Sequence, residues 1–268
     1  MDVSLAINEK VKRLKVVFEK DEVYKMFDSN LSKHKRYIII VMVAIALVIL
    51  WCIYMFQTRY VFMGQKIYEK DTLSIEIDCR EKKYSKYLKK VNQFTKIETL
   101  SIEYYDQDNY IQHISSNKTL KDLLIYFSDV EDASFINTMS NIKLLHCLET
   151  DIDFSKISSK YINTIELISC NIKNLDMLKN CSSLRKLELY KGSYEGMQKI
   201  KDKYVLQDSS IFSEFDTISD LCIHDLEIQD ISGFLNMESL KQINVSENSM
   251  TQDQISILES AGVQVITH

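Results

Sequence analysis

The longest hydrophobic pattern in the chain is an unbroken apolar run over residues 37–56, YIIIVMVAIALVILWCIYMF, with no charged residue, Asn, Gln or Pro. A helix of this length rises about 30 Å, the thickness of bilayer hydrocarbon, whereas a buried core helix has about 10–14 apolar residues. Tyr37 at one end and Trp51 and Tyr54 at the other suit the two membrane–water interfaces. A cleaved signal peptide does not fit, because 36 residues precede the run. We therefore expect a transmembrane helix over residues 37–57.

A second pattern repeats about every 22 residues through the rest of the chain. The rows begin at residues 97, 120, 142, 162, 184, 218 and 240, and six of the seven have apolar residues at positions 1, 4, 6 and 11. Positions 4 and 6 alternate as in a strand, and positions 1 and 11 place core residues in the flanking turns. The residues at positions 4 and 6 are Leu100 and Ile102, Leu123 and Ile125, Leu145 and Cys147, Ile165 and Leu167, Leu187 and Leu189, Leu221 and Ile223, and Ile243 and Val245. Because one row cannot bury its apolar face alone, we expect stacked rows that share one core.

These rows resemble the leucine-rich repeat, LxxLxLxx(N/C)xL, in its short bacterial or internalin-like form. The resemblance covers about residues 97–262 and implies an α/β solenoid, an arc with parallel strands on its concave face. The ninth position, where the family has Asn or Cys, is Cys170 and Asn248 in two rows. The other rows have Tyr105, Ser128, Thr150, Gly192 and Leu226 there. We therefore expect the fold to be intact but the turns to be irregular.

Both ends of the solenoid carry patterns that predict caps. Within residues 58–96, Leu73, Ile75 and Ile77 alternate as a strand, and a helix follows that is marked by Tyr84, Tyr87, Leu88, Val91 and Phe94. At the other end Ile255, Ile257 and Leu258 predict a helix, Gly262 its C-cap, and residues 263–268 a last strand.

Two further segments remain open to two interpretations. The row that begins at Leu184 has about 12 extra residues, which we place at about 192–215 and interpret either as a binding loop or as a tolerated surface loop. In the tail, residues 1–36, apolar residues recur at steps of three and four: Val3, Ile7, Val11, Leu14 and Phe18. They predict a basic amphipathic helix, which either contacts the membrane or dimerises, or only flanks the transmembrane helix.

The distribution of charge limits the partners and predicts an orientation. Residues 1–37 have nine Lys and Arg against six Asp and Glu, and the remainder has 24 against 32, so the net charge of −5 comes from an acidic body. An acidic body does not suit nucleic-acid binding. The cluster 33–36 before the apolar run is denser than Arg59 and Lys66 after it, which places the N-terminus in the cytoplasm and residues 58–268 outside.

The backbone chemistry is unusual, since the chain has no Pro and five Gly. Turns must therefore be made by Asn, Asp, Ser and Lys. The glycine spacing forms neither a P-loop nor a dinucleotide-binding motif.

Between the core positions of each row lie the side chains that should face solvent on the concave side. In the first rows these are apolar or aromatic, and Tyr190 extends them: Tyr104, Leu124, Tyr126, Phe127, Leu144, Leu148, Ile168 and Tyr190. A contiguous patch of this kind is typical of a protein-binding surface. The alternative is that a cap, the insertion or a second copy covers it.

Catalytic and metal-binding interpretations are weaker. His146, Glu166 and Glu188 occupy position 5 of successive rows, about 4.8 Å apart, which suits either a metal site or ordinary solvated surface. His224 with Asp220 and Asp225 lacks a nucleophile motif. The five cysteines outside the apolar run have no CxxC spacing and suit core positions.

Taken together, the sequence predicts a single-pass membrane protein whose solenoid binds another protein and which is not an enzyme and needs no cofactor. The alternative is a self-assembling structural membrane protein. The sequence leaves the partner and the oligomeric state open.

Overall fold

The computed structural model describes residues 33–106, 109–191, 209–248 and 250–267. The chain divides between Arg59 and Tyr60 into two compact units. In the first, α3 (Lys33–Arg59) is a single helix of 27 residues. Its segment Tyr37–Arg59 is long and apolar enough to cross a membrane, and its most apolar stretch is not buried in the protein.

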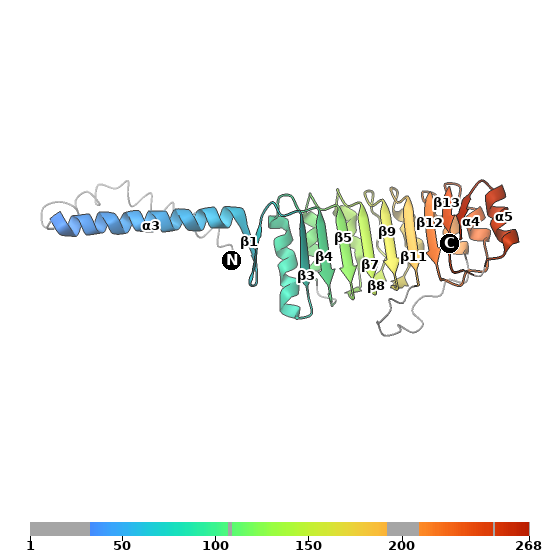
Figure 1. Cartoon of the computed structure of the whole chain (residues 1–268), viewed down its shortest axis with the longest axis horizontal. Helices are drawn as coiled ribbons and strands as arrows, with labels where there is room; N and C mark the ends of the chain where they lie inside the picture. Colours follow the sequence, from blue (N-terminus) through green and yellow to red (C-terminus); the bar gives the residue numbers. More distant parts are fainter. Residues whose placement is uncertain (1–32, 107–108, 192–208, 249, 268) are drawn as a thin grey trace. The chain divides into compact units, whose positions relative to one another are not determined.

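The second unit is built on one parallel sheet, which has nine strands in the described residues (Figure 1). The strands lie in the order β14-β13-β12-β11-β9-β7-β5-β4-β3, so neighbours in the sheet are successive rows of the sequence. Their bounds are β3 (Ser74–Asp78), β4 (Thr99–Glu103), β5 (Asp122–Tyr126), β7 (Leu144–Leu148), β9 (Thr164–Ile168), β11 (Lys186–Tyr190), β12 (Asp220–His224), β13 (Gln242–Asn244) and β14 (Gln264–Ile266).

The strand register is the one that the repeat predicts. Position 4 of each row pairs with position 4 of the next, from Leu100 opposite Leu123 to Leu221 opposite Ile243. All the residues predicted at positions 1, 4 and 6 are buried. The predicted fold class, an α/β solenoid, is therefore confirmed, and the buried core begins at Val61 and ends at Val263, without any residue of α3.

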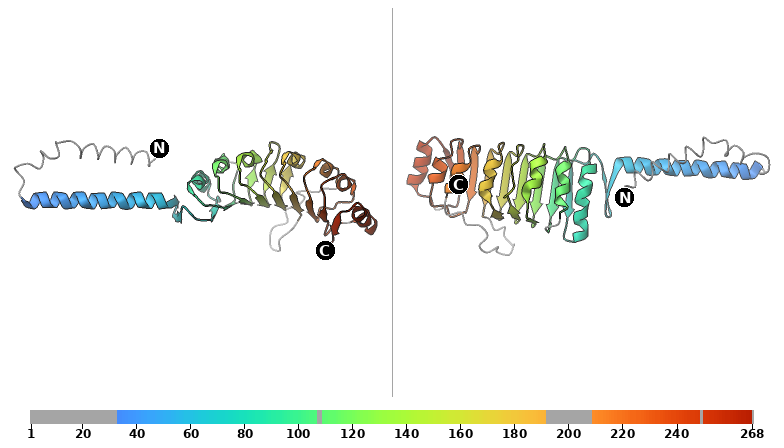
Figure 2. Two further views of the ribbon diagram at one scale, coloured as in Figure 1. Left: turned by 90° about the horizontal axis from the view of Figure 1, so that it is seen from above. Right: turned by 180° about the vertical axis from the view of Figure 1, so that it is seen from behind.

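Short helical segments form the opposite side of every row except that of β7, where residues 154–163 contain no helix. They are η1 (Lys82–Gln93), η2 (Ile111–Ser116), η3 (Ala133–Thr138), η4 (Leu175–Asn180), η5 (Ser210–Glu214), α4 (Ser232–Leu235) and α5 (Gln252–Ser260). Seen from above, these helical segments follow the outer side of an arc and the strands follow its inner side (Figure 2). A second, smaller parallel sheet joins three rows at the ends of the strands: β6 (Asp129–Val130), β8 (Asp151–Asp153) and β10 (Asn171–Lys173).

The turn after each strand is regular, which corrects the expectation of irregular turns. The residue at position 8 has a left-handed backbone in six rows, for example Phe127 with φ of 50° and Glu149 with φ of 48°. In five of these rows its N–H donates to a carbonyl of the next row, as Phe127 does to Leu148 at 2.9 Å. A left-handed non-glycine residue costs about 1–2 kcal/mol, so these inter-row hydrogen bonds offset a repeated strain.

Three of the ninth positions have different residues that share one task. Thr150 Oγ1 donates to the carbonyl of Ile125 at 3.2 Å, in the preceding row. Asn248 Nδ2 donates to the equivalent carbonyl of Ile223 at 2.7 Å. The Cys170 thiol lies 3.4 Å from the carbonyl oxygen of Cys147. Hydroxyl, amide and thiol groups thus reach the same acceptor. The rows therefore remain linked although most of the family's asparagines are missing.

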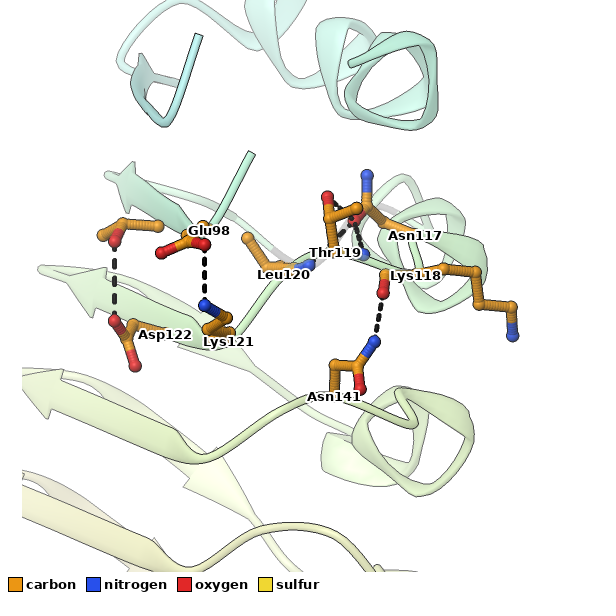
Figure 3. A network of polar contacts seen from close by, with 9 residues as sticks. Glu98, Asn117, Lys118, Thr119, Leu120, Lys121, Asp122 and Asn141 are labelled. Atoms are coloured by element: carbon orange, nitrogen blue, oxygen red, sulfur yellow. Dashed lines mark hydrogen bonds and ion pairs between the residues drawn. The ribbon is translucent and has the colours of Figure 1, made fainter. Parts of the chain in front are cut away.

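Asparagine also builds the turns that lead into the strands. The buried Asn117 accepts hydrogen bonds from the N–H groups of Thr119 and Leu120, at 2.9 and 3.0 Å (Figure 3). Its amide donates to the carbonyl of Val91 in the preceding row at 3.1 Å. The prediction that Asn and similar residues make the turns is confirmed at these positions.

The two ends of the sheet are covered differently. At the N-terminal end β3 and η1 follow an antiparallel hairpin of β1 (Tyr60–Met63) and β2 (Lys66–Glu69). Leu73, which the alternation placed in the first strand, lies before β3 and is 58% exposed, so that assignment was wrong. At the other end Thr251 and Gln254 form a capping box on α5, and Gly262, with φ of +87°, ends this helix.

Part of the predicted insertion belongs to the repeat structure. Its residues 192–208, like residues 1–32 of the predicted amphipathic tail, lie outside the described residues. The segment from Ser209 to Phe215 belongs to the core, which corrects its assignment to the insertion. Phe212 and Phe215 are buried, and the ring of Phe212 lies 5.3 Å from that of Phe234.

One glycine fixes how this segment packs. The N–H of Gly233 donates to Ser209 Oγ at 2.9 Å, and an added Cβ at Gly233 would lie 1.7 Å from the carbonyl oxygen of Ser209. We expect Gly233→Ala to lower the free energy of unfolding of residues 60–268 by about 3 kcal/mol or more, because backbone cannot move aside cheaply. Urea unfolding measures the change.

Gly262→Ala is the matched control. A Cβ at Gly262 would meet nothing within 4 Å, so only the left-handed backbone opposes it, at about 1–2 kcal/mol. Equal losses in the two variants would contradict the packing that we describe at Gly233.

Candidate functional site

The solvent-facing side of the sheet brings the predicted binding residues together. Position 7 of successive rows forms one ladder, in which Tyr126 pairs with Leu148, Leu148 with Ile168, and Ile168 with Tyr190. Leu124 and Leu144 stand on the same face at positions 5 and 3. Tyr104 and Phe127 follow β4 and β5 in the left-handed turns. We call these eight residues the concave patch: Tyr104, Leu124, Tyr126, Phe127, Leu144, Leu148, Ile168 and Tyr190.

The side chains of the concave patch reach solvent. Tyr104 is 36% exposed, and the other seven are half-buried. Alternation explains this, because positions 4 and 6 of each strand point into the core and positions 3, 5 and 7 point out. The patch is therefore an outer layer on a rigid sheet, and the described residues do not cover it.

Two aromatic rings and a guanidinium form the N-terminal edge of the patch. The rings of Tyr104 and Phe127 are stacked, with centroids 5.2 Å apart and planes at 20°. Arg80 Cζ lies 5.0 Å from the centroid of the Tyr104 ring. Arg80 also donates hydrogen bonds to the Asp78 carboxylate from its backbone N–H, Nε and Nη2, and it lowers the pKa of that carboxyl. The cation is thus fixed by its carboxylate while it lies over the ring.

The centre of the patch is bordered by a histidine–carboxylate pair. The rings of Tyr126 and His146 meet edge to face at 5.7 Å, and His146 Nδ1 lies 2.9 Å from Glu166 Oε2. Burial raises the pKa of Tyr126 above its ordinary value, so its phenol is neutral at physiological pH.

Glu188, the third residue of the possible metal triad, has other partners. Lys186 Nζ lies 2.6 Å from Glu188 Oε1, and the Tyr190 hydroxyl donates to Glu188 Oε2 at 3.3 Å. Among the described residues, no group of three His, Cys, Asp or Glu side chains is arranged to hold a metal ion.

The C-terminal edge of the patch is polar. The Cys222 thiol lies 3.2 Å from the Tyr190 hydroxyl, and burial is the main cause that raises the pKa of Tyr190. The ring of His224 lies 5.6 Å from that of Tyr190. The carboxylate of Asp220 accepts a hydrogen bond from Ser219 at 2.5 Å, and Asp225 lies in the left-handed turn. No contact between these groups arranges them as a catalytic triad.

Carboxylates surround the apolar centre. The outward positions of the strands from β3 to β12 carry Glu76, Asp78, Glu103, Asp122, Glu166, Glu188 and Asp220, against a single lysine, Lys186. At the strand ends, a shallow hollow of about 520 Å³ is lined by the Tyr104 and Phe127 rings and by four more carboxylates: Asp106, Asp129, Glu149 and Asp151. Sequence reasoning named the apolar residues but not this acidic border.

The register, the inward alternation and the linked ninth positions define the second unit as a leucine-rich-repeat solenoid with short rows. No protein-family model matches the sequence, and no curated protein matches it. The solved structures that resemble the chain at low identity include two internalins and a leucine-rich-repeat protein. An internalin (inlF) of Listeria monocytogenes is 14% identical, with a TM-score of 0.44, over 66% of this chain and 56% of that one.

The other two resemblances are similar in strength. Internalin C2 of Listeria monocytogenes is 14% identical, with a TM-score of 0.42, over 67% of this chain and 73% of that one. A leucine-rich-repeat protein of Leptospira interrogans is 12% identical, with a TM-score of 0.44, over 66% of this chain and 50% of that one. The chain thus spans about half the length of two of these three proteins.

Glu103 provides a pH test of the acidic border. Burial, then Glu76 and Asp78, raise the pKa of Glu103 above its ordinary value of 4.5. A carboxyl whose pKa is raised by folding weakens the fold when it is charged. We therefore expect Glu103→Gln to raise the melting temperature at neutral pH. The gain should shrink as the pH falls through the raised pKa and disappear below 4.5, where the wild-type carboxyl is protonated in both states.

Glu98→Gln is the comparison, because Glu98 has a lysine partner, Lys121, at 2.6 Å. It should give no gain at any pH. A gain for Glu103→Gln that grows in acid would contradict the assignment.

Proposed function

We propose that this chain is a membrane-anchored binding protein whose solenoid recognises another protein through the concave patch. The observation that supports this most directly is a contiguous apolar and aromatic surface, open to solvent on a rigid sheet. Apolar patches of this kind on soluble units mark interaction sites more often than not. Tyr and Phe are also typical of the residues that contribute most to binding energy.

The sheet favours binding for an entropic reason. Each strand of the patch is hydrogen-bonded on both sides, so its backbone loses little freedom when a partner binds. The rings of Tyr104 and Phe127 already contact each other, which restricts their rotamers before binding. Little ordering therefore remains to oppose the gain from burying the patch.

The anchor in this proposal is α3, whose apolar stretch is not buried. The denser basic cluster at 33–36 supports an orientation with the N-terminus in the cytoplasm and the solenoid on the other side of the membrane.

The double substitution Tyr126→Ser and Phe127→Ser tests the patch. We expect it to abolish capture of the partner by the tagged full-length chain, since each such truncation weakens binding by about 30-fold or more. The circular-dichroism melt should stay nearly unchanged, because neither side chain is in the buried core. A matching loss of stability would show that these residues are structural.

The control is Tyr161→Ser with Leu235→Ser, which removes two exposed apolar side chains outside the patch. It should retain the partner. If the full-length chain crosslinks only to itself, the alternative of a self-assembling structural protein replaces this proposal.

Orientation is tested by protease treatment of intact cells. We expect external protease to remove the solenoid and to spare an epitope tag at the N-terminus. Survival of the solenoid under conditions that digest a known surface protein would reverse the orientation.

A further inference from the structure

The second unit has a basic end and an acidic body. Residues 60–96 contain nine Lys and Arg against five Asp and Glu, whereas residues 97–268 contain fourteen against twenty-seven. Five of these basic residues lie on η1, and Lys66 lies on the hairpin of β1 and β2; both elements precede the first full row. A surface of this sign on an acidic protein indicates an anionic partner that differs from the partner of the concave patch.

A hollow at this end concentrates the positive charge. It has a volume of about 600 Å³ and is lined by three lysines of η1, Lys86, Lys89 and Lys90, with Phe62, Gly64, Tyr87 and Tyr110. No carboxylate lines it among the described residues. None of the ion pairs between described residues includes these three lysines, although the nearby Lys83 pairs with Glu81 and Lys96 with Asp71.

Aromatic rings hold these ammonium groups in place. Lys89 Nζ lies 4.6 Å from the centroid of the Tyr110 ring, and Lys86 and Lys90 Nζ each lie 5.5 Å from that of Tyr87. Lys90 also donates to the carbonyl of Phe62, which ties η1 to the hairpin. Unlike a carboxylate, a ring orients an ammonium group without neutralising it, so the charge remains available to an anion.

The hairpin adds an apolar edge beside the lysines. Phe62 and Ile67 face each other across its two strands and are 40% and 53% exposed. Gly64 makes the turn with φ of +65°, and an added Cβ there would lie 3.1 Å from the Tyr87 hydroxyl, so the hairpin packs closely on η1. Lysines next to exposed aromatic and aliphatic side chains suit the headgroup region of an anionic bilayer, where phosphate and acyl chains meet.

We propose that this surface, formed by Phe62, Ile67, Lys86, Lys89 and Lys90, binds the headgroups of anionic phospholipids. Phe62 follows Arg59, the last residue of α3, by only three residues. If α3 spans a bilayer, lipid headgroups are therefore within reach of this surface at high local concentration. The surface shares no residue with the concave patch, and its lipid binding does not depend on partner recognition there.

Vesicle binding by residues 60–268, whose core is self-contained, tests the proposal without the anchor. We expect co-sedimentation with vesicles of phosphatidylcholine and phosphatidylglycerol, little with phosphatidylcholine alone, and a decrease as salt rises. Substituting the three lysines, K86Q/K89Q/K90Q, should weaken binding about tenfold or more. F62S/I67S, which leaves the charge intact, should weaken it less.

The charge-matched control is K143Q/K160Q/K241Q, which removes three exposed lysines from the rows of the solenoid. It should bind anionic vesicles as the wild type does. An equal loss in this control, or equal binding to neutral vesicles, would overturn the proposal. So would release of the vesicles by millimolar inorganic phosphate, because that result would indicate a site for free anions.

Melting curves of each variant separate a loss of binding from a loss of folding. The concave variant Tyr126→Ser with Phe127→Ser should keep full vesicle binding. If that variant and the wild type both bind vesicles but the wild type captures no partner, only the proposed function fails. If the partner is captured but vesicles are not bound, only the lipid proposal fails.

Discussion

The structure depends on one constraint, which is that a row of about 22 residues buries its apolar face only against another row. Positions 4 and 6 of each strand have almost no exposure because the strands and turns of neighbouring rows enclose them. Every other feature follows from this stacking. The strands must be parallel and in register, the turns must link the rows, and both ends need caps because their last rows have only one neighbour.

The same constraint explains how much of the fold the sequence could predict. The repeated spacing determines which residues pair, so the register from Leu100 to Ile243 could be predicted without a structure. The repeated spacing could not predict features that depend on side-chain contacts between rows. The varied ninth position suggested irregular turns, but Thr150 and Cys170 reach the carbonyl that asparagine reaches in Asn248. The repeated spacing assigned Phe212 to an insertion because its partner in the core, Phe234, lies in another row.

The candidate surface was predictable to a similar degree. Successive side chains of a strand point to opposite faces of the sheet, so the sequence alone identifies the outward side chains of the concave patch. It does not show which of them touch. Arg80 lies over Tyr104 and is held by Asp78, and this arrangement joins a turn residue to the next row along the sheet. An Asp-x-Arg sequence directly after a predicted strand was the available signal, but short polar motifs of this kind are too common to be read alone.

The lysine surface at the N-terminal cap and the concave patch differ more in charge than the composition of the chain suggests. Among the ion pairs of the described residues, none includes Lys86, Lys89 or Lys90 of η1, whereas the concave patch is bordered by carboxylates such as Glu76 and Glu103. Within one domain these charges would be more stable if they were interspersed, because like charges that are grouped together repel. Their separation therefore has an energetic cost that folding does not require. The two proposed binding surfaces, for an anionic partner at the cap and for a protein on the concave side, would explain this cost better than random variation of an exposed surface does.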